Sequence, residues 1–366
     1  MRKIGTVVRQ AAIILAIYLA IDFGLAQLLP AEWLDPGKRA NRIDEAVHDL
    51  DIAYDHAFKP DVTVDRQFGP ILYRFQSDRF GFRTGSCAGT DADLAAGKPV
   101  VLLVGDSFTE GMGLPFEQTF AGLLACDWRQ QGAAVWNLGV QSYSPLIYGY
   151  RVRDAVDKLK VKPRDVLVFL DVSDIVDEAL SYAEKDGRVF RAETQPGAEA
   201  AAATFRSELG TYLQSNSVTG ALAMMLRTAW QQKRGQALTN HSRGDWPDDP
   251  EQMKAFGERG LALAAERMDR LVGYCKDWNC RLTLIVYPWP NQIAHDDRDS
   301  IQLRYWHDWA QRSGVRFIDG FAPFFAPPKA AALHDLYLTG DVHFSAAGHR
   351  LMARTVADAV KAAGGL

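Results

Sequence analysis

A serine stands at the point where a buried strand should end. The run VVLLV at residues 100–104 is uniformly apolar, as is typical of a strand covered on both faces of a parallel sheet. Gly-Asp-Ser follows directly, which puts Ser107 beyond the carboxyl end of the strand, where open parallel sheets bind their ligands. A serine hydroxyl becomes a useful nucleophile only when a base takes its proton. The position of Ser107 therefore directs attention to histidines that have an acid nearby.

The segment TGDVHFSAAGHRLMA, residues 339–353, supplies both groups. Asp341 and His343 are two residues apart in a loop before the last predicted helix. In an extended loop such side chains lie on the same side, so the carboxylate can orient the imidazole ring. These residue types predict acyl transfer, with Ser107 as nucleophile, His343 as base and Asp341 as orienting acid. The alternative is a metal site at Asp341 and His343. No third ligand is evident, and we expect neither a metal nor a cofactor.

Strand-length apolar runs alternate with helix-length segments from residue 99 onward. The runs lie at 100–104, 134–138, 165–171, 282–287 and 315–319. The helical segments lie at about 117–131, 145–160, 252–277, 299–313 and 345–363. This alternation predicts an α/β fold of three layers, doubly wound, around a mainly parallel five-stranded sheet.

Two regions do not fit the alternation. Residues 31–98 form an N-terminal extension, which we expect to pack on a catalytic domain at 99–366. An insert at about 180–250 is rich in alanine and is predicted to be helical, either as a lid over the site or as a packed helical hairpin.

The motifs resemble those of the SGNH or GDSL hydrolase superfamily. GDSFTEG at 105–111 is similar to its first block, and DVHFSAAGH at 341–349 to its last, in the same order and at a similar separation. The resemblance implies a flavodoxin-like fold with Ser107 as nucleophile, His343 as base and Asp341 as its acid. DRFGFR at 78–83 is similar to a stretch that precedes the first block in polysaccharide-linked members.

The same resemblance suggests an oxyanion hole, with one departure. NLGVQSYSP at 137–145 is similar to the second block, which implies that the amides of Gly139 and Ser107 donate to the oxyanion. The third block normally reads Gly-Asn-Asp, whereas this chain reads Val172-Ser173-Asp174. Either the Ser173 hydroxyl replaces the asparagine amide, or a water bridges, or the two backbone amides act without it. Ser173 would otherwise cap a helix that begins near Asp174.

Two further residues are expected to bind substrate. Trp289 follows the predicted fourth strand in Tyr-Pro-Trp-Pro, where an indole would suit stacking on a sugar ring. The alternative is a core tryptophan. Asp174 is expected beside the substrate, or else as a capping residue that holds the third-block loop.

The N-terminus reads as a signal anchor. Residues 11–29 are almost continuously apolar, basic residues precede them and Pro30 follows, and this length approaches what a bilayer requires. We expect residues 1–30 to be an uncleaved transmembrane helix of the inner membrane, with the catalytic domain facing the periplasm or exterior. A cleaved signal peptide, with Gly24-Leu25-Ala26 near its cleavage site, is the alternative.

The four cysteines favour export. Cys87, Cys126, Cys275 and Cys280 are even in number and contain no CxxC spacing. Of three possible connectivities we favour Cys87–Cys126 and Cys275–Cys280. Four buried thiols in a cytoplasmic enzyme remain the alternative.

Composition narrows the function. A net charge of −4 gives no basic excess, which argues against nucleic-acid binding. The resemblance implies a membrane-anchored serine esterase or O-acyltransferase that acts on acetyl esters of cell-surface or secreted carbohydrate. It also implies partners in a complex for polysaccharide biosynthesis or export. One alternative is a lipase or lysophospholipase, for which Met224, Met225 and Leu226 would supply an apolar mouth. The other is a catalytically weak polysaccharide-binding or scaffold protein.

Overall fold

The computed structural model describes residues 2–28, 47–50, 52–69, 71–191, 216–220, 222–223, 226 and 241–366. The chain divides into two compact units. The first comprises Met1–Arg42, Gln67–Ile71 and Gln195–Leu238, and the second comprises Ile43–Arg66, Leu72–Thr194 and Thr239–Leu366.

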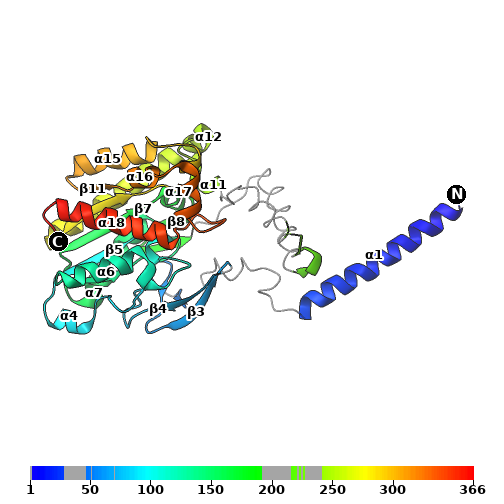
Figure 1. The fold of residues 1–366 in the computed structure, drawn as a ribbon, viewed down its shortest axis with the longest axis horizontal. Coiled ribbons are helices and arrows are strands. Elements are labelled where there is room, and N and C mark those ends of the chain that lie inside the picture. Colours follow the sequence, from blue (N-terminus) through cyan, green and yellow to red (C-terminus); the bar gives the residue numbers. More distant parts are fainter. Residues whose placement is uncertain are drawn as a thin grey trace. The chain divides into compact units, whose positions relative to one another are not determined.

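The second unit is built on a five-stranded parallel sheet with the order β11-β10-β7-β5-β6 (Figure 1). Its strands are β5 (Val100–Val104), β6 (Ala134–Asn137), β7 (Asp165–Leu170), β10 (Arg281–Val286) and β11 (Arg316–Asp319). Every residue of β5 and β7 is buried, because helices cover both faces of the sheet. After β5 the chain adds β6 on one side and then β7 on the other. The order therefore reverses beside β5, which is where ligands bind in such sheets.

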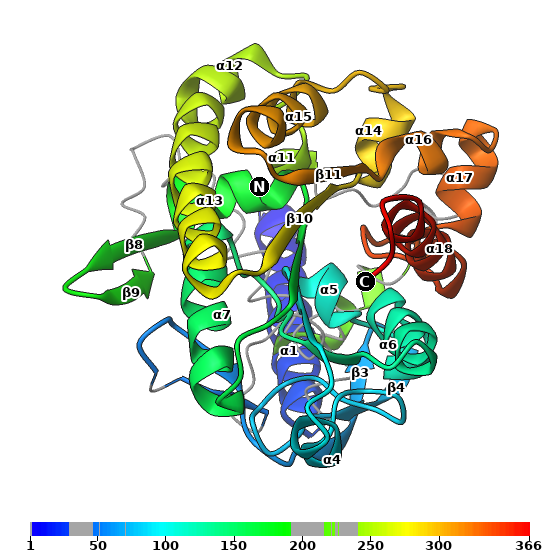
Figure 2. The ribbon, with the colours of Figure 1, turned by 90° about the vertical axis from the view of Figure 1, so that its left-hand side faces the viewer.

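Helices form the two outer layers, which confirms the α/β reading. Figure 2 shows α6 (Phe120–Gln130) and α18 (Ala346–Ala362) on one side of the sheet, and α7 (Pro145–Leu159) and α13 (Glu258–Trp278) on the other. The helix expected at 252–277 begins instead as α12 (Pro250–Gln252) and a π-helical turn, η3 (Met253–Gly257). The remaining helical elements are α4 (Asp91–Ala95), α5 (Ser107–Glu110), η1 (Phe116–Gln118), α8 (Val172–Val176), η2 (Asp177–Ser181), α11 (His241–Gly244), α14 (Pro290–Ala294), α15 (Ile301–Ser313), α16 (Phe321–Phe325) and α17 (Lys329–Asp335).

The segment before β5 contains short strands and is held by two buried arginines, Arg83 of the segment itself and Arg151 of α7. Its strands are β1 (His48–Asp49), β2 (Ala57–Phe58), β3 (Thr63–Phe68) and β4 (Ile71–Gln76). The guanidinium of Arg83 is buried and donates to the carbonyls of Glu110, Gly111 and Leu114, at the end of α5 and in the loop that follows it. Arg151 of α7 is also buried and donates to the Gly81 carbonyl at 2.6 Å. The Arg83 contacts join the segment to α5, which carries Ser107, and the Arg151 contact joins it to α7.

The N-terminal residues form the helix α1 (Arg2–Leu28). Among the helices of the described residues, however, none combines the length and the apolar character that crossing a membrane requires. The expected transmembrane helix at 1–30 is therefore not supported. Asp22 interrupts the apolar run, and its carboxylate accepts a hydrogen bond from the Thr219 amide at 2.9 Å.

The insert was expected to be helical, but its first part is a β-hairpin. β8 (Tyr182–Lys185) pairs antiparallel with β9 (Arg188–Arg191). Asp186 and Gly187 connect the strands with φ angles of 52° and 72°, the two left-handed positions that an Asp-Gly hairpin turn adopts. The Asp-Gly dipeptide was the signal for this hairpin. Met224 and Met225, the proposed apolar mouth, lie outside the described residues.

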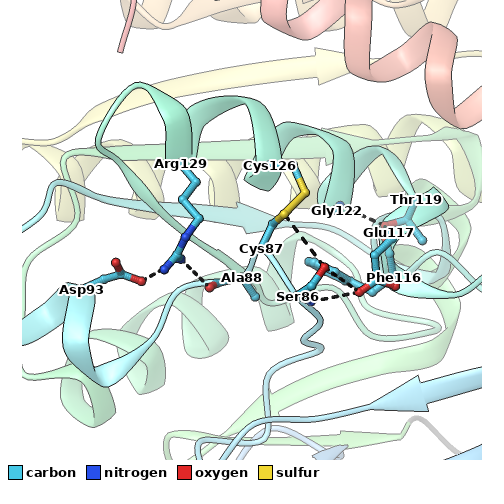
Figure 3. Close-up of a disulfide and its surroundings, with 10 residues drawn as sticks. All are labelled: Ser86, Cys87, Ala88, Asp93, Phe116, Glu117, Thr119, Gly122, Cys126 and Arg129. Atoms are coloured by element: carbon cyan, nitrogen blue, oxygen red, sulfur yellow. Dashed lines mark hydrogen bonds and ion pairs between the residues drawn. A yellow bond between two sulfur atoms is a disulfide. The ribbon is translucent and has the colours of Figure 1, made fainter.

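All four cysteines are paired as favoured, in Cys87–Cys126 and Cys275–Cys280. Figure 3 shows the first disulfide joining the loop before β5 to α6. Near it, Arg129 of α6 donates to the Ala88 carbonyl at 3.1 Å and to the Asp93 carboxylate at 2.9 Å. Covalent and polar contacts thus hold the same loop.

Candidate active site

Ser107 is the first residue of α5, three residues beyond the end of β5. Asp106 caps this helix, because its carboxylate accepts the Phe108 amide at 2.9 Å. Gly111 ends it in the left-handed region at φ 78°. The short helix therefore has a cap at each end, which fixes the direction of the serine side chain.

Three side chains predicted from the sequence meet at hydrogen-bond distance. The Nε2 atom of His343 lies 2.8 Å from the Ser107 Oγ, and the Nδ1 atom lies 2.5 Å from an Asp341 carboxylate oxygen. The same oxygen accepts the His343 amide at 2.9 Å, so backbone and ring are aligned together. The ring of Phe108 packs against the imidazole with 4.8 Å between centroids. The arrangement is that of a serine, a base and an orienting acid.

The electrostatics of the pair suit a general base. Burial would lower the pKa of His343, but the Asp341 carboxylate outweighs burial, and the pKa lies above its ordinary value of 6.5. For Asp341, burial would raise the pKa, yet the charge and hydrogen bonds of His343 lower it overall. Asp341 therefore stays ionised and stabilises the imidazolium that forms when the ring takes a proton.

Gly139 lies against the backbone that follows Ser107. A Cβ at this position would stand 2.6 Å from the Glu110 amide nitrogen and 2.6 Å from the Thr109 Cβ, so only glycine fits without movement. Its amide donates to the Asn137 side chain at 2.9 Å, and Asn137 in turn donates to the Thr109 carbonyl at 2.7 Å. The expected oxyanion donor is thus close to the serine helix but already has an acceptor within its own loop.

Ser173 neither caps α8 nor presents a spare hydroxyl. Asp171 caps this helix by accepting the Ser173 amide at 2.7 Å, and Asp174 reciprocally accepts the Asp171 amide at 2.9 Å. The Ser173 hydroxyl donates to the Asp171 carboxylate at 2.8 Å. The structure does not support the alternative that Ser173 caps the helix, because Asp171, the residue directly after β7, does so.

The two expected substrate-binding residues are in the core. Trp289 is 5% exposed, and its indole nitrogen donates to Asp171 at 2.8 Å. Asp174 is fully buried and accepts the Tyr148 hydroxyl at 2.8 Å. These polar groups turn inward because each finds its hydrogen-bond partner inside the protein, so neither side chain offers a surface to a sugar.

A cluster of buried acids behind Ser107 was not foreseen. Oxygen atoms of Asp106, Asp171 and Asp174 lie within 4.8 Å of one another, and all three side chains are buried. Burial, followed by the charge of Asp171, raises the pKa of both Asp106 and Asp174 well above the ordinary value. Asp106 and Asp174 therefore hold their protons to a higher pH than an exposed aspartate does. The signal was that Asp106 and Asp171 each follow a buried strand of the sheet.

His349, which the sequence placed at the start of the last helix, is structural. Its Nδ1 accepts the Phe120 amide at 3.0 Å, and burial lowers its pKa to about 3. It therefore remains neutral, and its ring packs against those of Phe120 and Phe344.

Comparison with solved structures gives similar proteins at low identity. An acetylxylan esterase from Geobacillus stearothermophilus is 14% identical, with 75% of this chain and 96% of that chain covered and a TM-score of 0.39. A psychrotrophic esterase from Pseudoalteromonas is 12% identical, with 72% and 97% covered and a TM-score of 0.39. An alpha/beta hydrolase from the metagenome of Lake Arreo in Spain is 14% identical, with 76% and 98% covered and a TM-score of 0.40. No protein-family model and no curated protein matches the chain. At these TM-scores the likeness carries no functional argument, so the function rests on the site.

Proposed function

We propose that this protein is a serine ester hydrolase of the SGNH or GDSL type that forms an acyl-enzyme on Ser107. The observation that carries the proposal is the hydrogen-bonded chain from Ser107 through His343 to Asp341, located beside the point where the strand order reverses. The resemblance of the sequence blocks at 105–111 and 341–349 to this superfamily supports the same chemistry.

The proposed reaction has two halves. The Ser107 Oγ attacks the ester carbonyl carbon as the Nε2 atom of His343 takes the hydroxyl proton, and Asp341 stabilises the resulting imidazolium. His343 then gives that proton to the leaving alkoxide, which leaves an ester on Ser107. In the second half His343 takes a proton from a water, whose oxygen attacks the carbonyl carbon of this ester. The bond from that carbon to the Ser107 Oγ then breaks, His343 gives the proton to Oγ, and the acid is released. A sugar hydroxyl in place of water would give O-acyl transfer with the same residues.

The Ser107 amide is the proposed main donor to the oxyanion. It stands at the first position of α5, where an amide has no acceptor within its own helix. The Gly139 amide and the Ser173 hydroxyl donate to Asn137 and Asp171, respectively. Each would have to leave its present acceptor before it joined the oxyanion hole.

The proposed substrate is an acetyl ester of a cell-surface or secreted carbohydrate. Support comes from the stretch DRFGFR, similar to one found in polysaccharide-linked members, whose Arg83 holds the loop after α5. We propose an exported location because disulfides persist in oxidising compartments and all four cysteines are bonded.

The hydrolase proposal is tested with p-nitrophenyl acetate and a fluorophosphonate probe. Ser107→Ala and His343→Ala should each reduce kcat by at least about 1000-fold, and the double variant should be little worse than either, because the residues act as a unit. Ser107→Ala should also lose the covalent label. His295→Ala is the matched control, since His295 pairs with Asp248 at 3.2 Å and is exposed. Labelling that survives Ser107→Ala, or losses that add in the double variant, would exclude the mechanism.

A further inference from the structure

Both ring nitrogens of His56 face oxygen acceptors. The Nδ1 atom lies 2.6 Å from an Asp55 carboxylate oxygen, and the Nε2 atom lies 2.8 Å from the Gln141 carbonyl oxygen. The side chain is fully buried, so water cannot replace either contact. A neutral imidazole has only one N–H group, and a carbonyl oxygen cannot donate. Both contacts are hydrogen bonds only if the ring carries two protons.

Asp55 is the anion that such a ring requires. It also pairs with Arg191 of β9, with 3.0 Å between the nearest nitrogen and oxygen atoms. Burial alone would raise the pKa of Asp55, but the hydrogen bonds from His56 and Arg191 lower it overall. The carboxylate therefore holds no proton that it could give to Nδ1. Aromatic side chains surround the ring, with His48 at 5.8 Å and Tyr143 at 5.1 Å between centroids.

A negatively charged side chain, Glu110, contacts the backbone amide of Gln141. The Gln141 amide donates to the Glu110 carboxylate at 2.9 Å, and Glu110 is fully buried at the end of α5. Arg66 pairs with the second Glu110 oxygen at 2.8 Å. The N–H of Gln141 thus faces an anion while its C=O faces the imidazole of His56. Gln141 is two residues beyond Gly139, in the loop that packs against the backbone of α5.

We propose that His56 is a doubly protonated positioning residue, which with Glu110 clamps Gln141 and so fixes the Gly139 loop beside Ser107. The inference deepens the proposed esterase function and rests on it for its kinetic consequence. The Asn137 side chain at the start of this loop donates to the Thr109 carbonyl at 2.7 Å, and the space beside Gly139 is too small for a Cβ, so the loop has little freedom to move without moving the backbone after the nucleophile. Small displacements of positioning groups can cost about 100-fold in rate.

Kinetics test the positioning role through two substitutions. His56→Leu removes both donors and should lower kcat for p-nitrophenyl acetate by about 10- to 100-fold with KM changed less than about 3-fold. His56→Gln retains an amide donor for the Gln141 carbonyl and should recover part of that loss. His295→Leu, at an exposed histidine that also pairs with an aspartate, should leave kcat unchanged. A folded His56→Leu variant with wild-type kcat would overturn the positioning role.

Spectroscopy tests the protonation independently of activity. In the wild-type protein with ¹⁵N-labelled histidine, the His56 resonances, assigned by their absence in His56→Gln, should show protons on both ring nitrogens at pH 7. A neutral ring would overturn the inference. If His56→Leu does not fold, Asp55→Asn provides the kinetic test, because it removes the anion and should lower kcat in the same way. If wild-type protein has no esterase activity, the proposed function fails, while the NMR result still decides the protonation of His56.

Discussion

At the scale of the residue, one carboxylate sets the charge on the proposed base. The Asp341 charge raises the pKa of His343, and a base must be neutral to act, so the rate should rise with pH through a value above 6.5. In Asp341→Asn that pKa falls, and the rise in kcat/KM should move to lower pH. The plateau should also drop by on the order of 100- to 10,000-fold, because the ring loses its orienting partner. A pH–rate profile of both proteins measures each effect.

Asp335→Asn is the control for this profile, since Asp335 pairs with a neighbouring histidine at an exposed site. This control should change neither the pH at which kcat/KM rises nor the plateau value of kcat/KM. If kcat/KM of Asp341→Asn rises at the same pH as in the wild-type protein, another acid sets the pKa of His343. Asp171 would then be the candidate, because its charge also raises the pKa of His343.

Ser173 provides a second residue-scale prediction. Because its hydroxyl donates to the buried Asp171, Ser173→Ala should lower the free energy of unfolding by about 1 to 2 kcal/mol and leave kcat within about 3-fold. Thermal unfolding and kinetics on the same sample separate the two effects. Ser181→Ala is a matched control, since that hydroxyl donates to Asp177 at 2.7 Å. A 10-fold fall in kcat with constant KM would mean that the Ser173 hydroxyl donates to the oxyanion.

At the scale of the element, the strands of the sheet could be predicted from the sequence. β5 has the predicted bounds, and each of the other four strands of the sheet ends within one residue of its predicted end. The strands β5 and β7 are covered on both faces, and such runs are almost continuously apolar. The triad was also readable, since a strand end and a short loop restrict where side chains lie. For Trp289 and Asp174 the structure favours the alternatives, a core tryptophan and a residue of the helix cap. The sequence could not decide this, because it does not show which partner a polar group finds. Their partners, Asp171 and Tyr148, are distant in the chain.

The Gly139 loop gives the element-scale prediction. Gly139→Ala would place a Cβ 2.6 Å from the Glu110 amide nitrogen, so the loop or α5 must shift. We expect a loss of about 1 to 3 kcal/mol in unfolding free energy and at least 10-fold in kcat. Gly273→Ala in α13 has open space at the Cβ and should instead raise stability by about 0.5 to 1 kcal/mol. Full activity in Gly139→Ala would show that the loop position does not control the rate.

At the scale of the whole molecule, the two disulfides should contribute unequally to stability. Cys87–Cys126 closes a separation of 39 residues, and Cys275–Cys280 closes one of 5. On a chain-entropy basis the first should contribute about 4 kcal/mol and the second about 2 kcal/mol. Denaturant unfolding of the two paired Cys→Ser variants should show this order. Equal losses, or a larger loss at Cys275 and Cys280, would mean that loop closure does not determine the effect.

The buried acids behind Ser107 also make folding a proton-binding reaction. Asp106 and Asp174 have pKa values raised well above 3.8 in the folded state by burial, whereas both ionise in the unfolded chain at neutral pH. At a pH between the unfolded-state and the folded-state pKa values, the chain therefore takes protons from the buffer as it folds. The contribution of these two groups to the free energy of unfolding is greatest in acid and declines as the pH rises through their folded-state pKa values. The heat measured on unfolding must consequently include the ionisation heat of whichever buffer surrounds the protein.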